Sequence, residues 1–246
     1  MTKPVRPVTK LARPVTRPVR GELDSLARQI ISCERCPRLR AHCREVAIEK
    51  RRAYRDQIYW GRPVPGFGDP RARLLVVGLA PGAHGANRTG RLFTGDSSGD
   101  WLYAALYAHG FANQARSVSR DDGLRLCEAW ISAATRCAPP DNRPTLGELD
   151  HCRPYLEAEI RLLAGVRVVV TLGAIAHQAW LRAAGWWSTL APAARPRFGH
   201  GRESRLPDGT IVISSYHPSR QNTQTGRLTR PRWNAIFARA RRRLDD

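Results

Sequence analysis

One stretch decides the fold: Arg73-Leu74-Leu75-Val76-Val77-Gly78-Leu79-Ala80-Pro81-Gly82. Its apolar, β-branched first half predicts a buried strand, which Gly78 ends in a glycine-rich loop. That loop continues as Ala83-His84-Gly85-Ala86-Asn87-Arg88-Thr89-Gly90-Arg91-Leu92-Phe93-Thr94-Gly95-Asp96-Ser97-Ser98-Gly99. In α/β proteins ligands bind at the carboxyl ends of the strands, so we expect a binding site here.

The loop does not match the common phosphate-binding patterns. No Lys-Ser or Lys-Thr pair follows the glycines, as a P-loop requires, and the GxGxxG spacing of dinucleotide sites is absent. A purely structural turn remains an alternative for such a loop taken alone.

Further strands and helices are predicted on both sides of this stretch. We expect strands at 129–135, 166–172 and 211–214, and helices at 22–31, 101–109, 146–163, 173–183 and 230–243, with a basic helical segment at 39–59. Thr145 and Glu148 form a capping box at the start of the third of these helices. The alternation predicts a three-layer α/β/α fold with a central, mostly parallel four-stranded sheet. Loops after the first, second and fourth strands then meet at one edge.

The charge of the chain points to a polyanionic partner. The 246 residues hold 41 lysines and arginines against 21 acidic residues, a net charge of +20. A GC-rich coding background can explain the choice of arginine over lysine, but not the excess of positive over negative charge. Residues 1–20 predict a disordered, basic tail rich in proline and valine, and residues 21–246 a single domain.

No apolar run is long enough to span a bilayer, and the N-terminus lacks the apolar core of a secretory signal. We therefore expect a cytoplasmic protein in which thiols stay reduced. Cys33, Cys36, Cys137 and Cys152 are candidate metal ligands, and their spacing allows either tetrahedral zinc or an iron–sulfur cluster. Cys43 is a competing candidate, and we expect Cys127 to lie in the core.

Two stretches together resemble a known family. Gly78 to Gly82, His84 to Arg91 and Phe93 to Asp96 resemble motif A of the family-5, or type-B, uracil-DNA glycosylases. Ser215-Tyr216-His217-Pro218-Ser219-Arg220-Gln221-Asn222-Thr223-Gln224-Thr225-Gly226-Arg227 resembles the motif B of that family. With the cysteines, the resemblance extends from about Cys33 to the C-terminal helix. It implies a structural 4Fe-4S cluster on the four cysteines named above.

The resemblance also implies roles for single residues, each with a structural alternative. Phe93 is where the family stacks an aromatic ring on the base, unless it is an ordinary core residue. His217 would hydrogen-bond the base oxygen as its negative charge grows. Motif A lacks the usual water-activating side chain, since Leu79 and Ala80 follow Gly78, as is typical of family 5.

That absence moves the search for a catalytic group to two other residues. Asp96 would orient water or stabilise the sugar cation, and Asn142 would recognise the base edge. Their alternatives are a helix cap and a turn residue. Leu92 stands where a proline is common in the relatives, which changes loop stiffness more than chemistry.

Two groups of residues complete the expected site. The substrate-binding set is Gly78, Ala80, Phe93, His84 and Asn87, and the DNA-binding set is Arg88, Arg91, Ser219, Arg220, Gln221 and Asn222. We expect residues 220–224 to form a loop that enters the DNA at the flipped nucleotide.

The leading hypothesis is therefore that the protein is a monofunctional glycosylase that starts base-excision repair. We expect it to remove uracil, and also hypoxanthine and other deaminated bases, from double-stranded DNA and to leave an abasic site. No lysine lies in either motif, which argues against lyase chemistry. We further expect a monomer associated with the nucleoid. The rival hypothesis is a catalytically silent DNA-damage-binding module of the same fold, and a nucleotide-binding enzyme is a weaker third.

Overall fold

The computed structural model describes residues 17–246, so the predicted tail lies outside the described residues except at its end. The helices are α1 (Arg17–Ile31), α2 (Pro37–Glu49), α3 (Ala86–Thr89), α4 (Ser97–Ala108), α5 (Leu146–Leu162), α6 (Ala174–Ala183), α7 (Trp186–Thr189), α8 (Arg220–Gln224) and α9 (Arg230–Asp245). Short 3₁₀ turns lie at Arg52–Tyr54, Pro140–Asn142 and Pro192–Ala194.

The strands form one sheet of six, in the order β1-β3-β2-β4-β6-β5. They are β1 (Phe67–Gly68), β2 (Leu74–Gly78), β3 (Ala129–Ala133), β4 (Val168–Leu172), β5 (Arg202–Arg205) and β6 (Ile211–Ser215). The four predicted strands are the parallel centre β3-β2-β4-β6. Two antiparallel edge strands, β1 and β5, were not predicted, so the expected four-stranded sheet has six strands.

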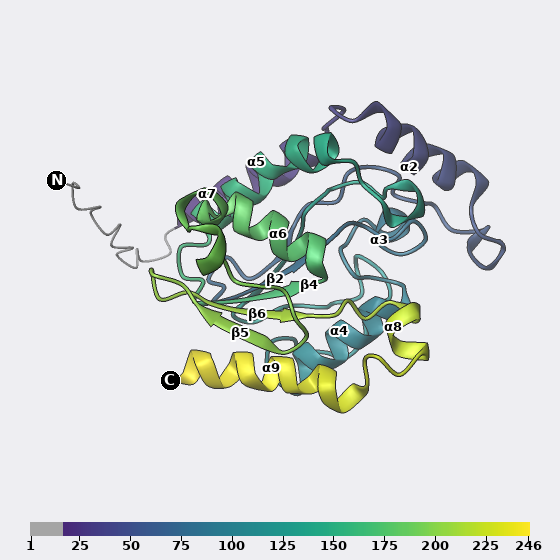
Figure 1. Cartoon of the computed structure of the whole chain (residues 1–246). Coiled ribbons are helices and arrows are strands. Elements are labelled where there is room, and N and C mark those ends of the chain that lie inside the picture. Colours follow the sequence, from purple (N-terminus) through teal and green to yellow (C-terminus); the bar gives the residue numbers. More distant parts are fainter. Residues whose placement is uncertain (1–16) are drawn as a thin grey trace.

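Helices cover both faces of the sheet, which confirms the three-layer α/β/α architecture (Figure 1). Along β2 the side chains alternate: Leu74 and Val76 face α4 and α9, whereas Leu75 and Val77 face α1, α5 and α6. Both faces are apolar, as expected for a parallel sheet buried on both sides.

The capping box at the start of α5 is present. The Thr145 hydroxyl accepts a hydrogen bond from the Glu148 N–H, and the Glu148 carboxylate accepts one from the Thr145 N–H. Two buried N–H groups at the helix start are therefore satisfied by the side chains that the sequence supplies.

Several local predictions need correction. Helix α1 begins at Arg17, so residues 17–20 are helical and do not belong to a disordered tail. The 39–59 segment is helical only as far as Glu49. Cys127 is exposed instead of lying in the core, because Leu124 and Leu126 point inward and the residues between and after them point out.

No helix in residues 17–246 is both long and apolar enough to cross a membrane.

Candidate active site

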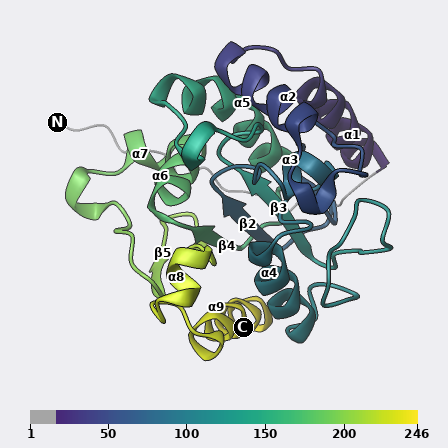
Figure 2. The same ribbon diagram turned by 90° about the vertical axis from the view of Figure 1, so that its right-hand side faces the viewer.

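The expected site residues lie on loops at the carboxyl ends of the parallel strands. Motif A follows β2, the Asn142 turn follows β3, and motif B follows β6. Figure 2 is turned so that this edge of the sheet, with α3, α4 and α8 around it, faces the viewer. Parallel pairing thus brings together segments that are far apart in the chain.

Phe93 and His217 meet at the centre of this edge. Their rings are stacked, with centroids 5.8 Å apart and an interplanar angle of 29°. A Cβ atom placed on Gly78 would lie 2.7 Å from Cζ of Phe93, so only glycine lets the ring approach the strand end this closely. Phe93 also has a φ of 53°, which is strained for a bulky residue and is held by the surrounding loop.

His217 is kept neutral by its surroundings. Desolvation lowers the pKa of the imidazole from its ordinary value to about 4. Its carbonyl oxygen accepts a hydrogen bond of 2.8 Å from the Asn222 side-chain amide, which ties the histidine to α8. The neutral ring still carries one N–H that can donate a hydrogen bond.

Asp96 is the N-cap of α4. Its Oδ1 accepts a hydrogen bond of 2.9 Å from the Gly99 N–H, so the capping alternative is correct for this oxygen. The other oxygen, Oδ2, occupies the space that Cβ atoms on Gly82 and Gly85 would take. Burial raises the pKa of the carboxyl group, while the backbone N–H groups at the helix start oppose that shift. Capping leaves Oδ2 without a structural task.

The α4 start also contacts motif B directly. The Ser98 hydroxyl donates a hydrogen bond of 3.2 Å to the carbonyl oxygen of Pro218. This contact joins the two motifs, and no pattern in the sequence indicated it.

His84, Ala80 and Asn142 border the same edge. Nδ1 of His84 is 3.1 Å from the Tyr59 hydroxyl, a partner that the sequence did not reveal. Ala80 is partly exposed. Asn142 is exposed and has a φ of 55°, after Asp141 with a φ of 53°, so this residue also shapes the turn.

Asn87 points away from the loop surface. Its side chain is 1% exposed, and Nδ2 donates to the carbonyl oxygen of Cys43 at 3.2 Å. This amide nitrogen therefore fastens motif A to α2. Oδ1 has no hydrogen-bond partner within residues 17–246, so contact of Asn87 with substrate stays a prediction.

Arg88 is buried in the same loop. Its guanidinium donates to the carbonyl oxygens of His84 and Gly95 and to the side chain of Gln57, and it lies 3.9 Å from the Tyr54 ring centroid. Three of its five N–H groups are bonded inside the protein and the residue is only 8% exposed, so this guanidinium presents little to a phosphate.

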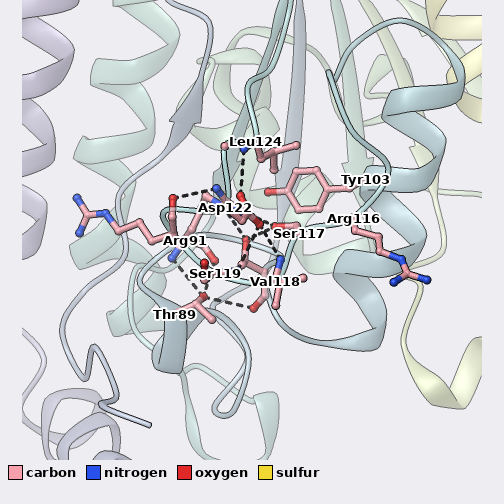
Figure 3. Close-up of polar contacts among 12 residues, drawn as sticks. Thr89, Arg91, Tyr103, Arg116, Ser117, Val118, Ser119, Asp122 and Leu124 are labelled. Carbon is pink, nitrogen blue, oxygen red and sulfur yellow. Dashed lines mark hydrogen bonds and ion pairs between the residues drawn. The ribbon is translucent and has the colours of Figure 1, made fainter.

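Arg91 is likewise internal, with a side chain that is 4% exposed. Figure 3 shows its polar contacts with the neighbouring loop. It forms a salt bridge of 2.7 Å with Asp122 and donates to Thr94, Ser117 and the carbonyl oxygen of Arg120. Burial opposes ionisation of Asp122, but the hydrogen bonds from Arg91 and the loop N–H groups lower the pKa of this carboxyl group. The prediction of phosphate contacts by Arg88 and Arg91 is therefore wrong, because both hold loops in place.

The expected DNA-entering segment is helical. Ser219 is the N-cap of α8, which contains Arg220, Gln221 and Asn222. Arg220 and Gln221 are exposed, whereas Asn222 is partly buried against His217. The segment still projects beside motif B, as a short helix instead of a loop.

An aromatic group beside motif B was also missed. His200 stacks on Tyr216 with ring centroids 5.1 Å apart, and the Arg227 guanidinium lies 4.2 Å from the Tyr216 ring centroid. Tyr216 directly precedes His217, which was the one available signal.

The candidate metal ligands come from three parts of the chain. Cys33 follows α1, Cys36 is the N-cap of α2, Cys137 follows β3, and Cys152 lies in α5. Burial and the charges of Cys152 and Cys33 raise the pKa of Cys36 to about 11, so these sulfur atoms are close enough to repel as thiolates. Positive charge from a metal centre would relieve this repulsion, and four thiols suit a soft metal.

Two observations concern Cys43 and other side chains that could compete with these four cysteines as metal ligands. Cys43 packs in one buried cluster with Cys137, and its thiol lies 3.6 Å from the carbonyl oxygen of Ala138. Among residues 17–246, no three His, Cys, Asp or Glu side chains are grouped for a single metal ion.

Residues 65–241 match the family model of the uracil DNA glycosylase superfamily, so the fold and the site define a protein of this superfamily. The chain is 51% identical over 223 residues to a type-5 uracil-DNA glycosylase of Mycobacterium tuberculosis, covering 90% of this chain and 82% of the relative. It is 49% identical over 219 residues to that of Thermus thermophilus, covering 89% and 97%. For Pyrobaculum aerophilum the identity is 44% over 210 residues, covering 85% and 88%. The chain belongs to the type-5 uracil-DNA glycosylase family.

Proposed function

We propose that this protein is a monofunctional uracil-DNA glycosylase, which hydrolyses the N-glycosidic bond of uracil in double-stranded DNA and leaves an abasic site for base-excision repair. The observation that carries the proposal is the stack of Phe93 and His217 over Gly78, at the edge where motifs A and B meet. The names of the type-5 relatives support the choice of uracil.

The reaction needs a stacked base, a donor to the departing base and a group near the sugar. Phe93 supplies the stacking surface, worth roughly 1–3 kcal/mol per base. His217 is neutral and donates its N–H to the base oxygen as negative charge develops there. A neutral donor is useful here because it leaves the departing base as an anion without a full proton transfer.

Asp96 is the group that we assign to the sugar side. With Oδ1 engaged at the helix start, Oδ2 remains for a water molecule or for the positive charge that develops on the sugar. Asn142, exposed on the turn after β3, is assigned to the edge of the base. Because Leu79 and Ala80 place no polar side chain after β2, we infer a pocket that also accepts hypoxanthine and other deaminated bases.

We infer that Cys33, Cys36, Cys137 and Cys152 hold a structural 4Fe-4S cluster. Thiolates are the ligands of such clusters, and the four residues join α1, α2, the loop after β3 and α5. The cluster supplies no electron to a hydrolysis; its place between these elements indicates that it clamps the N-terminal helices to the domain. Cys43, next to Cys137, is the residue that could substitute as a ligand.

For the partner, the net charge of +20 supports duplex DNA, and we propose a monomer that acts in the cytoplasm on the nucleoid.

Single-turnover cleavage of an end-labelled duplex with one U·G pair, followed by alkali, tests the proposal. Product that requires alkali, and comparable product from a hypoxanthine duplex, is the expected result. Retention of the duplex without any abasic product would instead establish a silent damage-binding module, and product from uracil alone would restrict the pocket to that base.

A further inference from the structure

A groove lies beside β5, the strand at one end of the sheet. It encloses about 620 Å³ between β5 and the segment 190–197. Its lining combines arginines with apolar residues and includes Arg195, Arg197, Arg202, Arg205, Leu190 and Pro207.

The positive charges of this groove are not neutralised by neighbouring acids. No acidic side chain lines it. Side chains alternate along β5, so Glu203 lies on the face opposite the groove, together with Arg205, and is paired with Arg243 at 2.9 Å. Within residues 17–246, the side chains of Arg197 and Arg202 have neither a hydrogen-bond acceptor nor a salt bridge, and both are exposed. The groove therefore favours an anionic ligand.

The backbone of β5 adds a second feature. Leu206 N–H bonds to the Thr210 carbonyl oxygen, whereas Ile211, opposite Arg205, directs its N–H to Arg167 beside β4. In an antiparallel ladder this alternation turns the N–H and C=O groups of Glu203 and Arg205 away from β6, toward the free edge. A free edge of this kind can accept an extended chain as an added strand.

The charge and the edge together select the ligand. A second copy of β5 would bring arginine against arginine, which is unfavourable. The groove runs along β5 from Leu206, beside the start of β6, to Arg202, which is opposite Ser214 near the end of β6. A DNA duplex would contact only the arginines, whereas an extended peptide also pairs with the free N–H and C=O groups of Glu203 and Arg205. The strand edge therefore favours a peptide as the occupant of this groove.

We propose that β5 and its arginines form a docking site for an acidic, extended segment of another protein. The segment adds to β5 as a strand and places its carboxylates, on the face of the groove, beside Arg197 and Arg202. This site is independent of the glycosylase activity proposed above.

Fluorescence anisotropy with a fluorescein-labelled peptide of sequence Glu-Val-Glu-Val-Glu-Val tests the proposal on the full-length protein. We expect saturable binding that weakens at least tenfold in the double variant R197E/R202E. The matched control R28E/R161E changes net charge equally at exposed arginines on α1 and α5, and should bind within twofold of wild type. A Gln-Val-Gln-Val-Gln-Val peptide should not bind.

A second measurement on the wild-type protein covers the case in which the double variant does not fold. The amide signals of Glu203 and Arg205 should shift and gain protection from hydrogen exchange when the peptide saturates. Equal weakening in both double variants, or unchanged amides at these two residues, would overturn the proposal. So would a thymidine hexanucleotide that binds through Arg197 and Arg202 while the peptide does not, since the groove would then be a nucleic-acid surface.

Discussion

The ring of Phe93 lies on the imidazole of His217, with 5.8 Å between the ring centroids. The two residues come from loops after β2 and β6, two strands that are separated in the sheet by β4. A base that stacks on Phe93 thus lies next to a neutral donor without further rearrangement of the backbone. The relationship depends on the absence of a side chain at Gly78.

Replacing Gly78 with alanine should abolish this arrangement. The new Cβ would meet the Phe93 ring at 2.7 Å from Cζ, so the ring must leave the strand end. We expect single-turnover excision to fall at least tenfold while the protein stays folded. The control Gly21→Ala introduces a Cβ with nothing within 4 Å and should keep full activity. Equal activity of G78A and G21A would exclude Phe93 in this position as the stacking surface.

Two substitutions of Asp96 separate its cap from its chemistry. Asparagine is also a good N-cap, so the free energy of unfolding of Asp96→Asn should lie within a few tenths of a kcal/mol of the wild-type value. The free energy of unfolding of Asp96→Ala should be lower by about 0.5–2 kcal/mol. Excision should be severely reduced in both variants because both lack the carboxylate. Chemical denaturation and single-turnover kinetics measure the two effects. Normal excision by D96N would leave Asp96 with a structural role only.

Acid should destabilise the protein through His217. The pKa of this imidazole is about 4 in the folded protein, against about 6.5 in an unfolded chain. Between these values the unfolded chain binds a proton that the folded protein does not, so the free energy of unfolding falls as the pH is lowered from about 6.5 toward about 4.

Melting temperatures of wild type and His217→Gln at a series of pH values check this expectation. The wild type should lose stability relative to the variant as the pH falls through that range. Parallel curves would show that His217 is not held in its neutral form.

The cysteines differ in their expected effect on bound iron. Changing Cys33, Cys36, Cys137 or Cys152 to alanine should remove iron and the associated visible absorption from anaerobically purified protein. Cys127→Ser is the control, because this thiol is exposed and is not a proposed ligand. This variant should retain its full iron content. If C137A retained iron and C43A lost it, Cys43 and not Cys137 would be the ligand. Equimolar zinc without iron would overturn the cluster assignment.

Removing one member of the Arg136–Glu159 pair should destabilise the protein more than replacing both. Their side chains are each 1% exposed and are joined by a salt bridge of 2.7 Å. Removing one partner, as in Arg136→Met or Glu159→Met, should cost about 3–5 kcal/mol, because it leaves a buried charge alone. The double variant should be more stable than either single variant. Additive losses in denaturation experiments would show that the two side chains do not interact.

The parts of the fold that the sequence predicted share a strong local pattern. β2, β4 and β6 are apolar runs, and α5 carries its own cap in Thr145 and Glu148. The edge strands lacked such a pattern: β1 is only Phe67–Gly68 among prolines and glycines, and β5 reads Arg-Glu-Ser-Arg. Edge strands need no buried apolar face on both sides, so hydrophobic periodicity does not reveal them.

The site was predicted less evenly than the fold. The motifs placed Phe93, Asp96 and His217 at one edge because the parallel topology requires it. Arg88 and Arg91 were misassigned because their charge suggests the surface, whereas their planar donor groups satisfy carbonyl oxygens inside the loop. Such a choice depends on which acceptors the folded loop presents, and the sequence does not show them.

The order of the parallel strands also has a consequence for synthesis on the ribosome. The β2 loop with Phe93 emerges early, but β6, which delivers His217, is the last of the four parallel strands to be made. A nascent chain or a prematurely terminated product that ends before Tyr216 already carries much of the positive charge, yet it holds only one side of the site. In the proposed mechanism such a fragment lacks the donor to the departing base, so we expect activity only after β6 and motif B have been made.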